Sequence, residues 1–377
     1  MKTRSAHQLL SQCLAGVFNQ ALDIKDLPAN DTEWQSMLQL SGTQLITPFL
    51  RWALQENALL QTLPTEVLDY LETFYSLNLD DNHRYQDQLA ELIQTLNRIG
   101  VRPLLLKGAA TLVSGLYPTP GERYIGDIDI LIPPDKLAEI LVALSEIGYA
   151  PKTTDQPPPT AEDFVKQRRC HHHYPGIRSL AWPIWVELHI HPVHLAVAEC
   201  LTAEEMVQDA TLFSWRGGEC LLPSPTHFVM HNIIHSYFVN YKMEENLRLR
   251  QLFEFVHVSR VYANQIDWTA IQQRFNSRRY YRNGLSYYVA LANAYLGFQP
   301  PPEISIGYWI QLRAKLHLMW IKSALAYYLL YLFYLIFRLK VFARNPRLLK
   351  KKLLTLSFYK SFYQSLRSFK TKMWTSV

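Results

Sequence analysis

Two aspartates separated by one residue, Asp127 and Asp129, have the spacing in this 377-residue chain that points most directly to chemistry. They stand in the apolar segment Gly126–Ile132. In a β-strand, residues i and i+2 share a face, so both carboxylates project together while the isoleucines between them face a core. Adjacent carboxylates repel each other, and a hard divalent cation such as Mg²⁺, which binds one or two carboxylates together with substrate phosphates, relieves that repulsion. The pair therefore predicts a metal site for phosphate chemistry, with a solvated strand edge as the alternative.

A third carboxylate is expected on a neighbouring strand, because nucleotidyl transfer commonly uses two metal ions about 3.5–4 Å apart. The segment 184–191 alternates between apolar and polar residues, so Glu187 shares one strand face with two histidines. An acid on an apolar strand is unfavourable unless it is paired or bound to metal. We therefore predict that Asp127, Asp129 and Glu187 hold metal; an outer-face glutamate beside exposed histidines is the alternative.

Phosphate-binding residues are predicted where Lys107-Gly108 follow the apolar strand 104–106 and precede a helix-like stretch. Gly108 has no Cβ and lets the backbone approach a phosphate, and the start of a helix offers free N–H groups to an anion. Lys107 and Arg123 can add positive charge. A simple turn is the alternative interpretation of Lys107-Gly108.

The elements that must position these residues predict an α+β fold. In this fold a small mixed β-sheet core lies between helical N-terminal and C-terminal regions. The expected regions are a helical N-terminal region (1–99), a catalytic core (100–222), a helical C-terminal domain (223–303), and an apolar helix with a basic tail (304–377). Apolar periodicity further predicts particular elements. They are a long helix from Pro64 to Gly100, a helix ending at Gly148, a hairpin at 212–222, and helices at 225–241, 246–262, 268–276 and 279–296.

The order of these motifs resembles a known family. Lys-Gly, then Arg-x-x-x-Asp-x-Asp, then a Val-Glu-Leu-His strand are similar to the DNA polymerase β-like nucleotidyltransferase superfamily. More narrowly, they resemble an uncharacterised bacterial nucleotidyltransferase family that is often encoded in biosynthetic clusters. The likeness is strongest over residues 100–195. It implies that Asp127, Asp129 and Glu187 bind Mg²⁺ (or Mn²⁺). The wider superfamily has Gly-Ser or Gly-Gly where this chain has Lys107-Gly108, which fits the narrower group and leaves the substrate open.

The resemblance implies a transferase that moves an NMP group from an NTP, with ATP expected, to an acceptor hydroxyl and releases pyrophosphate. The acceptor stays open: a sugar phosphate, another metabolite, a peptide, a protein or an RNA end. Removing Asp127 or Asp129 is expected to abolish transfer and leave the fold intact or slightly more stable, because a repulsion is relieved.

Two other classes of function remain as alternatives. One is a non-catalytic nucleotide-binding or membrane-associated scaffold. The other is a metallohydrolase that uses His171, His189 and His191. A stripe of His227, His231 and His235 on one helix face is expected to pack against the catalytic core. The metal content of the purified protein separates the classes, since Mg²⁺- or Mn²⁺-dependent nucleotide binding indicates the transferase and stoichiometric zinc the hydrolase.

The charge is concentrated at the C-terminus. The chain carries +6, and residues 338–377 contain eleven Lys or Arg and no acid, so residues 1–337 carry −5, the difference between +6 and +11. The body therefore lacks the basic footprint of a nucleic-acid-binding protein. The four cysteines have no C-x-x-C spacing, which argues against a disulfide framework or a zinc knot.

The N-terminus lacks the apolar run of a signal peptide, so a cytoplasmic location is expected. The apolar run 318–337 is interpreted as a buried or interfacial helix, with membrane spanning as the alternative. The basic tail that follows it can make peripheral contact with anionic lipid.

Overall fold

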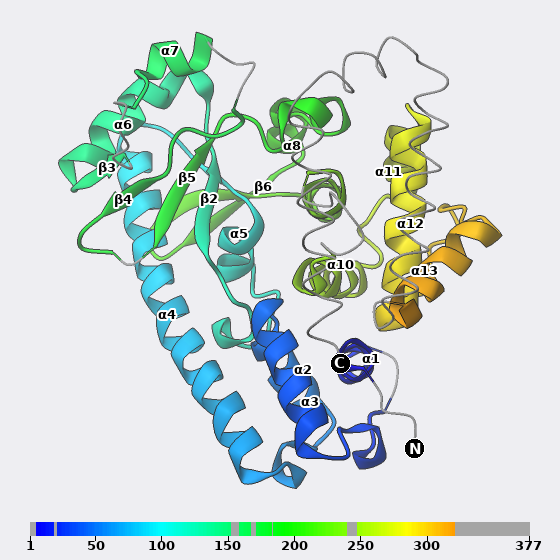
Figure 1. The fold of residues 1–377 in the computed structure, drawn as a ribbon. Coiled ribbons are helices and arrows are strands. Elements are labelled where there is room, and N and C mark those ends of the chain that lie inside the picture. Colours follow the sequence, from blue (N-terminus) through cyan, green and yellow to red (C-terminus); the bar gives the residue numbers. More distant parts are fainter. Residues whose placement is uncertain are drawn as a thin grey trace, which may run out of the picture. The chain divides into compact units, whose positions relative to one another are not determined.

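The structure is a computed structural model that describes residues 5–18, 21–151, 158–166, 171–182, 184–239 and 247–320. Met1–Lys315 form one compact unit, and Leu316–Val377 form a second. Of the second unit, only the end of helix α13 lies among the described residues. The first unit contains every strand of the described residues and helices α1 to α12 (Figure 1).

The strands of the described residues are β1 (Leu104–Leu105), β2 (Asp127–Leu131), β3 (Tyr149–Pro151), β4 (Ile177–Ser179), β5 (Trp185–His189), β6 (Thr211–Trp215) and β7 (Gly218–Leu222). The α-helices are α1 (Ala6–Ala15), α2 (Asp31–Thr43), α3 (Thr47–Glu56), α4 (Thr65–Arg98), α5 (Lys107–Ser114), α6 (Leu137–Glu146), α7 (Ala161–Lys166), α8 (Ala203–Gln208), α9 (Pro225–Ile233), α10 (Leu249–Val261), α11 (Trp268–Phe275), α12 (Arg279–Leu296) and α13 (Tyr308–Trp320).

The seven strands form one mixed sheet in the order β3-β4-β5-β2-β1-β7-β6. Strand β2 runs parallel to β5, and β1 runs parallel to β7, while the other neighbours are antiparallel. Helical segments precede and follow this sheet in the sequence. The predicted α+β class, with a small mixed sheet between helical regions, is confirmed.

The central strand pair sets the register of the acidic residues. Along the parallel β2–β5 ladder, Asp129 is the partner of Glu187, and Asp127 is the partner of Trp185. Because paired residues on adjacent strands point to the same face of a sheet, Asp129 and Glu187 are brought side by side.

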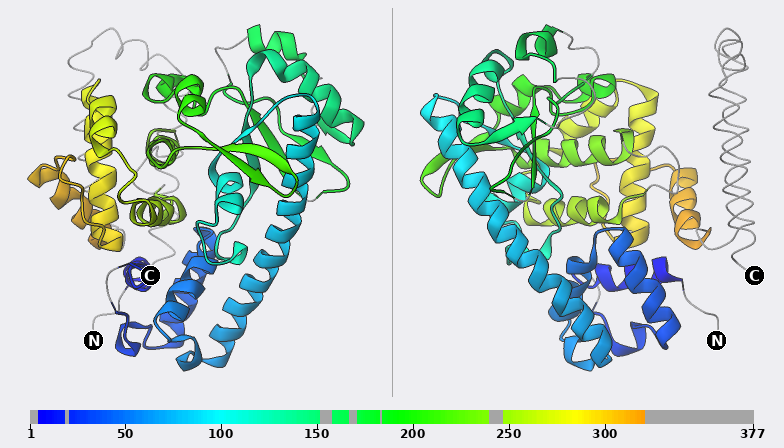
Figure 2. Two further views of the ribbon diagram at one scale, coloured as in Figure 1. Left: turned by 180° about the vertical axis from the view of Figure 1, so that it is seen from behind. Right: turned by 60° about the vertical axis from the view of Figure 1, so that its left-hand side comes forward.

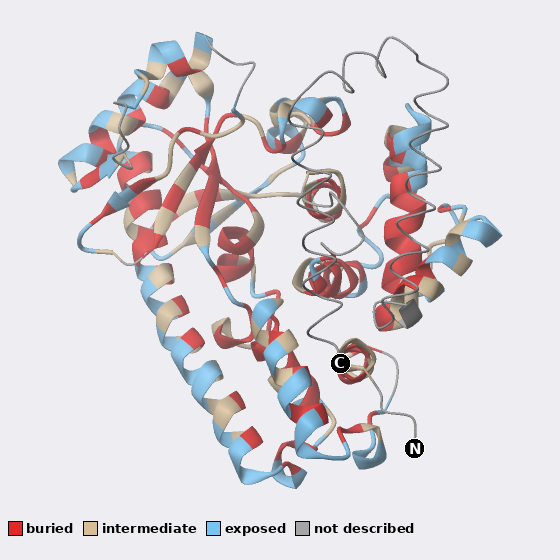
Figure 3. Cartoon of the chain, in the orientation of Figure 1, coloured by how far each residue is buried: buried red, intermediate tan, exposed pale blue. Residues whose placement is uncertain are grey.

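The apolar core lies between the sheet and the helices beside it, where Figure 3 shows buried residues on the strands and on the facing sides of the helices. Alternate residues of β2 and β5 supply one side, and every third or fourth residue of α4 supplies the other. Its members include Ile128, Ile130, Val186 and Leu188 from the strands and Leu89, Leu92, Ile93 and Leu96 from α4. Figure 2 shows α3 lying against the other half of α4.

A stripe of amide side chains on α4 holds the segment that leads into β2. Asn78, Asn82 and Gln86 are spaced four residues apart and therefore lie on one face of the helix. Their side-chain amide groups donate hydrogen bonds to main-chain carbonyls. Asn78 donates to Gly121 (2.7 Å), and Asn82 donates to Pro120 (2.6 Å) and Arg123 (2.7 Å). Gln86 donates to Leu112 (2.9 Å). We call these three residues the amide stripe. It fixes the path of the backbone immediately before Asp127.

Glu122, in the same segment, should make stability fall as pH rises. It is 3% exposed, and its Oε2 has no hydrogen-bond partner among the described residues. Burial raises the pKa of Glu122 to about 7 from a reference value of 4.5. Between these two values the folded state binds more protons than the unfolded state, so the free energy of unfolding falls with rising pH, by at most about 3 kcal/mol.

Glu122→Gln should remove this dependence and raise the melting temperature at pH 8 relative to the wild type. Thermal unfolding of both proteins at pH 5 and pH 8 measures it, and the exposed Glu146→Gln serves as the control. An equal effect of Glu122→Gln at both pH values would contradict the assignment.

Several predicted elements can be compared directly with the structure. Helix α4 follows Pro64 and ends before Gly100, and β6 with β7 forms the predicted hairpin. The helix predicted at 225–241 is α9 followed by a π-helical turn, Ile234–Val239. Among the described helices, none combines the length and the apolar character that a membrane-spanning segment requires. The apolar run 318–337 and the basic tail lie almost wholly outside those residues.

Candidate metal and nucleotide site

Asp129 is the centre of the site. It has no exposed surface, and its Oδ1 accepts hydrogen bonds from Lys107 Nζ (2.7 Å) and His189 Nε2 (2.8 Å). Its Oδ2 is buried and has no hydrogen-bond partner among the described residues. A buried carboxylate oxygen without a donor is unfavourable, and a metal ion is one group that can satisfy it.

Three side chains around this point can hold a cation together. The ligand atoms of Asp129, Glu187 and His189 all lie within 4.8 Å of one another. His189 Nε2 is 2.8 Å from Asp129 Oδ1 and 3.5 Å from Glu187 Oε2. Neighbouring ligands of an octahedral ion with bonds of about 2.0–2.1 Å are separated by about 3 Å. These three side chains could hold one divalent ion, which would take the place of the proton that His189 Nε2 donates to Asp129 Oδ1.

Asp127 lies outside this compact group although it shares the face of Asp129 on β2. It is half-buried at the start of the strand and lines a cavity next to it. Of the three carboxylates predicted to hold metal, the structure brings Asp129 and Glu187 together with His189, and it places Asp127 at the adjoining cavity wall.

The two aspartates have opposite electrostatic surroundings. Burial and the charge of Asp129 raise the pKa of Asp127 to about 6. Burial would also raise the pKa of Asp129, but Lys107 and His189 hold it well below its usual value. The expectation that removal of either aspartate relieves repulsion therefore applies to Asp127. For Asp129 the surroundings favour the opposite outcome, because this carboxylate compensates the charge of Lys107.

Lys107 and Gly108 begin helix α5, as predicted, but their surroundings add a second role. Lys107 has a left-handed backbone (φ 45°) and a side chain that is 18% exposed. A Cβ on Gly108 would lie 2.6 Å from Nη1 of Arg123. Glycine at this position thus makes room for the Arg123 side chain, and both residues line the cavity.

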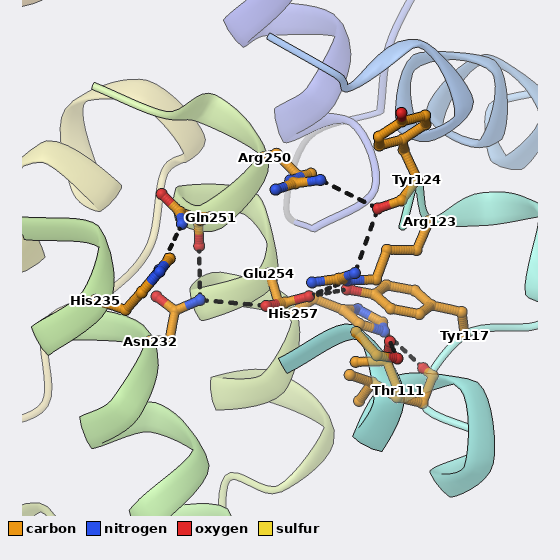
Figure 4. Close-up of polar contacts among 12 residues, drawn as sticks. Thr111, Tyr117, Arg123, Tyr124, Asn232, His235, Arg250, Gln251, Glu254 and His257 are labelled. Atoms are coloured by element: carbon orange, nitrogen blue, oxygen red, sulfur yellow. Dashed lines mark hydrogen bonds and ion pairs between the residues drawn. The ribbon is translucent and has the colours of Figure 1, made fainter. Parts of the chain in front are cut away.

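Arg123 forms a buried ion pair with Glu254 of α10 (Figure 4). The two side chains are 8% and 5% exposed. Glu254 is also approached by the hydroxyl of Tyr117 (3.5 Å) and by Nδ2 of Asn232 (3.4 Å). Breaking such a buried pair by removing one partner typically costs about 3–5 kcal/mol. Arg123 therefore joins the segment before β2 to the helical part of the unit.

A cavity of about 110 Å³ separates the start of β2 and α5 from helices α9 and α10. The sheet side of the cavity is lined by Lys107, Gly108, Arg123 and Asp127. The helical side is lined by polar residues, namely His231, Asn232, His235, Arg250, Gln251 and Glu254. His231 Nε2 donates to the carbonyl of Pro192 (2.8 Å), just beyond β5, so this member of the predicted histidine stripe does contact the core. Burial lowers the pKa of His231 to about 4, so its imidazole is neutral at pH 7.

Arg250 and Glu254 were not anticipated from the sequence. One signal was available, since Glu254 interrupts the apolar sequence of α10 between two phenylalanines, and an acid there needs a buried partner. The alternative zinc set is not assembled: of His171, His189 and His191, only His189 belongs to the group of described residues that can hold a metal.

The mixed sheet thus places the Asp-x-Asp pair and the third acid on adjacent parallel strands, which are the motifs on which the resemblance rests. The chain belongs to the family of uncharacterised nucleotidyltransferases, whose family model matches residues 30–297. The likeness inferred from the motifs is thereby confirmed at the level of the family.

Among solved structures, the chain is similar to an antigenic nucleotidyltransferase-like protein from Paracoccidioides brasiliensis. The two are 18% identical, with a TM-score of 0.31, over 48% of this chain and 77% of that one. No curated protein matches the chain.

Proposed function

We propose that this protein is a divalent-metal-dependent nucleotidyltransferase that moves an NMP group from an NTP to an acceptor hydroxyl with release of pyrophosphate. The observation that supports it most is the buried, unpartnered Oδ2 of Asp129 within the group formed with Glu187 and His189. Membership of a nucleotidyltransferase family supports a transferase rather than a hydrolase.

The charges of the site favour a divalent cation. Asp127, Asp129 and Glu187 face one ammonium, that of Lys107, so with all carboxylates ionised the group has an excess of two negative charges. We assign the metal, Mg²⁺ or Mn²⁺, to these three carboxylates, with His189 beside them. A bound ion of this kind polarises a phosphoryl oxygen and activates an attacking hydroxyl.

The remaining residues would bind and orient the nucleotide. Lys107 can donate to Asp129 or to a phosphate oxygen, and the N–H of Gly108 lies at the start of α5, where an anion is favoured. For Arg123 we propose a positioning role, since its Nε is bound to Glu254 while its Nη1 lies against Gly108. ATP is the nucleotide to test first. The acceptor stays among sugar phosphates, other metabolites, peptides, proteins and RNA ends.

Calorimetry with metal-free protein tests the proposal. The non-transferable analogue α,β-methylene ATP should bind in the presence of Mg²⁺ or Mn²⁺ and not in EDTA, because the site without metal is negatively charged. Incubation with each α-labelled NTP and a cell extract should then label the acceptor. Nucleotide binding that is equal in EDTA, or stoichiometric zinc in the purified protein, would overturn the proposal.

A further inference from the structure

The cavity beside the metal site has, on its helical side, a positively charged residue to which the proposed function assigns no role. Arg250 stands in the first turn of α10 and lines the cavity together with Gln251. Lys107 and Gly108 line the same cavity from α5. The two sets belong to segments more than a hundred residues apart in the chain, and they come together within the first unit.

Arg250 differs from Arg123 in how its charge is compensated. Arg123 is paired with Glu254, whereas Arg250 forms no ion pair with a carboxylate in the described part of the chain. Its Nη1 donates to the carbonyl of Tyr124 (3.2 Å), which also accepts from Arg123 Nη1 (3.3 Å), as Figure 4 shows. Two guanidinium groups thus converge on one carbonyl, while Glu254 is the one carboxylate among the described residues that is bonded to either of them.

A partly buried guanidinium without a carboxylate partner is unfavourable unless an anion binds to it. Its planar set of N–H groups matches phosphate oxygens and can donate two parallel hydrogen bonds. The Tyr124 carbonyl occupies one donor of Arg250 and fixes its orientation, and the guanidinium carries further N–H groups that this bond does not use.

We propose that Arg250 binds the polyphosphate of the nucleotide from the side opposite to Lys107 and Gly108. The nucleotide would then lie between α5 and α10, and the helical part of the first unit would supply part of the active site. This inference rests on the proposed function and extends it, because it assigns the second wall of the phosphate site.

The chemistry of the cavity favours a polyphosphate over a single small anion. Cationic or N–H donors stand on both walls, and Asp127, which also lines the cavity, is a candidate metal ligand. A chain of phosphates can contact both walls and a metal at once, as in phosphoryl-transfer sites where cationic side chains and metal ions share the charge. A phosphorylated acceptor has the same anionic chemistry, and separate ligands distinguish the two sources.

The test compares Arg250→Ala with Arg248→Ala, a matched control at an exposed arginine two residues earlier. In Mg²⁺, Arg250→Ala should weaken binding of α,β-methylene ATP and of inorganic tripolyphosphate by about 10- to 100-fold, the range expected for losing charge-assisted hydrogen bonds. Arg250→Lys should retain part of the affinity, and Arg248→Ala should match the wild type. Thermal unfolding checks that the variants fold. If Arg250→Ala is unstable, Arg250→Gln replaces it in the binding measurements.

Unchanged affinity of the Arg250 variants for both polyphosphate ligands would overturn this inference and leave the proposed function standing. A loss confined to glucose 1-phosphate, used as a phosphate monoester, would place Arg250 at the acceptor and also overturn it. Failure of the wild type to bind any nucleotide in Mg²⁺ or Mn²⁺ would overturn the proposed function and this inference together.

Discussion

Asp129→Asn is expected to abolish metal-dependent nucleotide binding and to lower the free energy of unfolding of the metal-free protein by about 3–5 kcal/mol. The reason is that Asp129 is fully buried and accepts hydrogen bonds from Lys107 and His189. An amide cannot balance the ammonium of Lys107, which would then be a largely buried charge without a partner. The loss should shrink as pH falls, because the pKa of Asp129 is depressed and the wild type loses this stabilisation on protonation.

Asp127→Asn should have the opposite effect on stability while it also abolishes transfer. Burial and the charge of Asp129 raise the pKa of Asp127 to about 6 from 3.8. The folded state therefore binds more protons between these values, and the wild type loses stability as pH rises through that range. At pH 7 the asparagine variant should be more stable than the wild type by on the order of 1–3 kcal/mol, and the difference should vanish near pH 4.

Urea unfolding in EDTA measures both effects, with pH 7 compared with pH 4 for Asp127 and with values below 3.8 for Asp129. Asp135→Asn, at an exposed position just beyond β2, is the control. If both variants shifted stability in the same direction at pH 7, the contrast between the two aspartates would be refuted. If Asp129→Asn retained metal-dependent nucleotide binding, the metal assignment would be wrong.

Lys107→Ala is expected to tighten metal binding in the absence of nucleotide and to lower the catalytic efficiency of transfer. Lys107 Nζ lies 2.7 Å from Asp129 Oδ1, so its positive charge repels a cation that approaches the same carboxylate. Its removal should tighten Mn²⁺ binding without nucleotide by on the order of tenfold, given Coulomb energies of several kcal/mol at such distances. In the presence of nucleotide, loss of one electrostatic contact to phosphate should reduce kcat/KM by roughly 10²- to 10³-fold.

Electron paramagnetic resonance of free Mn²⁺ measures the first effect and needs no activity. Steady-state kinetics measures the second, and Lys136→Ala, at a half-exposed surface ion pair, is the control. Weaker Mn²⁺ binding by Lys107→Ala would show that the lysine supports the metal site instead of competing with the metal.

The strand face on which each acidic residue lies was predictable from local sequence, since alternation of apolar and polar residues fixes which side chains share a face. The strand register was not, and it decides that Glu187 lies beside Asp129 and that Asp127 stands apart. Hydrogen bonding of His189 to Asp129 follows from the same register. These contacts depend on how two strands align, which the sequence of neither strand determines alone.

The residues that α10 contributes to the site could not be predicted from local sequence, for a different reason. Arg123 and Glu254 are separated by 131 positions, and no spacing rule connects them. The role of Gly108 illustrates the same limit. The absence of a Cβ was predicted to admit a phosphate, while the structure shows that it also admits the side chain of Arg123.

The amide stripe of α4 gives the site a support that is indifferent to salt and to pH. Asn78, Asn82 and Gln86 are uncharged at every accessible pH, and their partners are main-chain carbonyls. Ionic screening and protonation act on charged groups, so they leave these bonds unchanged. The stripe itself bonds only the main chain of this segment, whereas the side chain of Arg123 is held separately by Glu254. Changes in ligand affinity with buffer conditions should therefore reflect the charged groups around Asp129 and Arg250, while the backbone of the segment before β2 keeps its path.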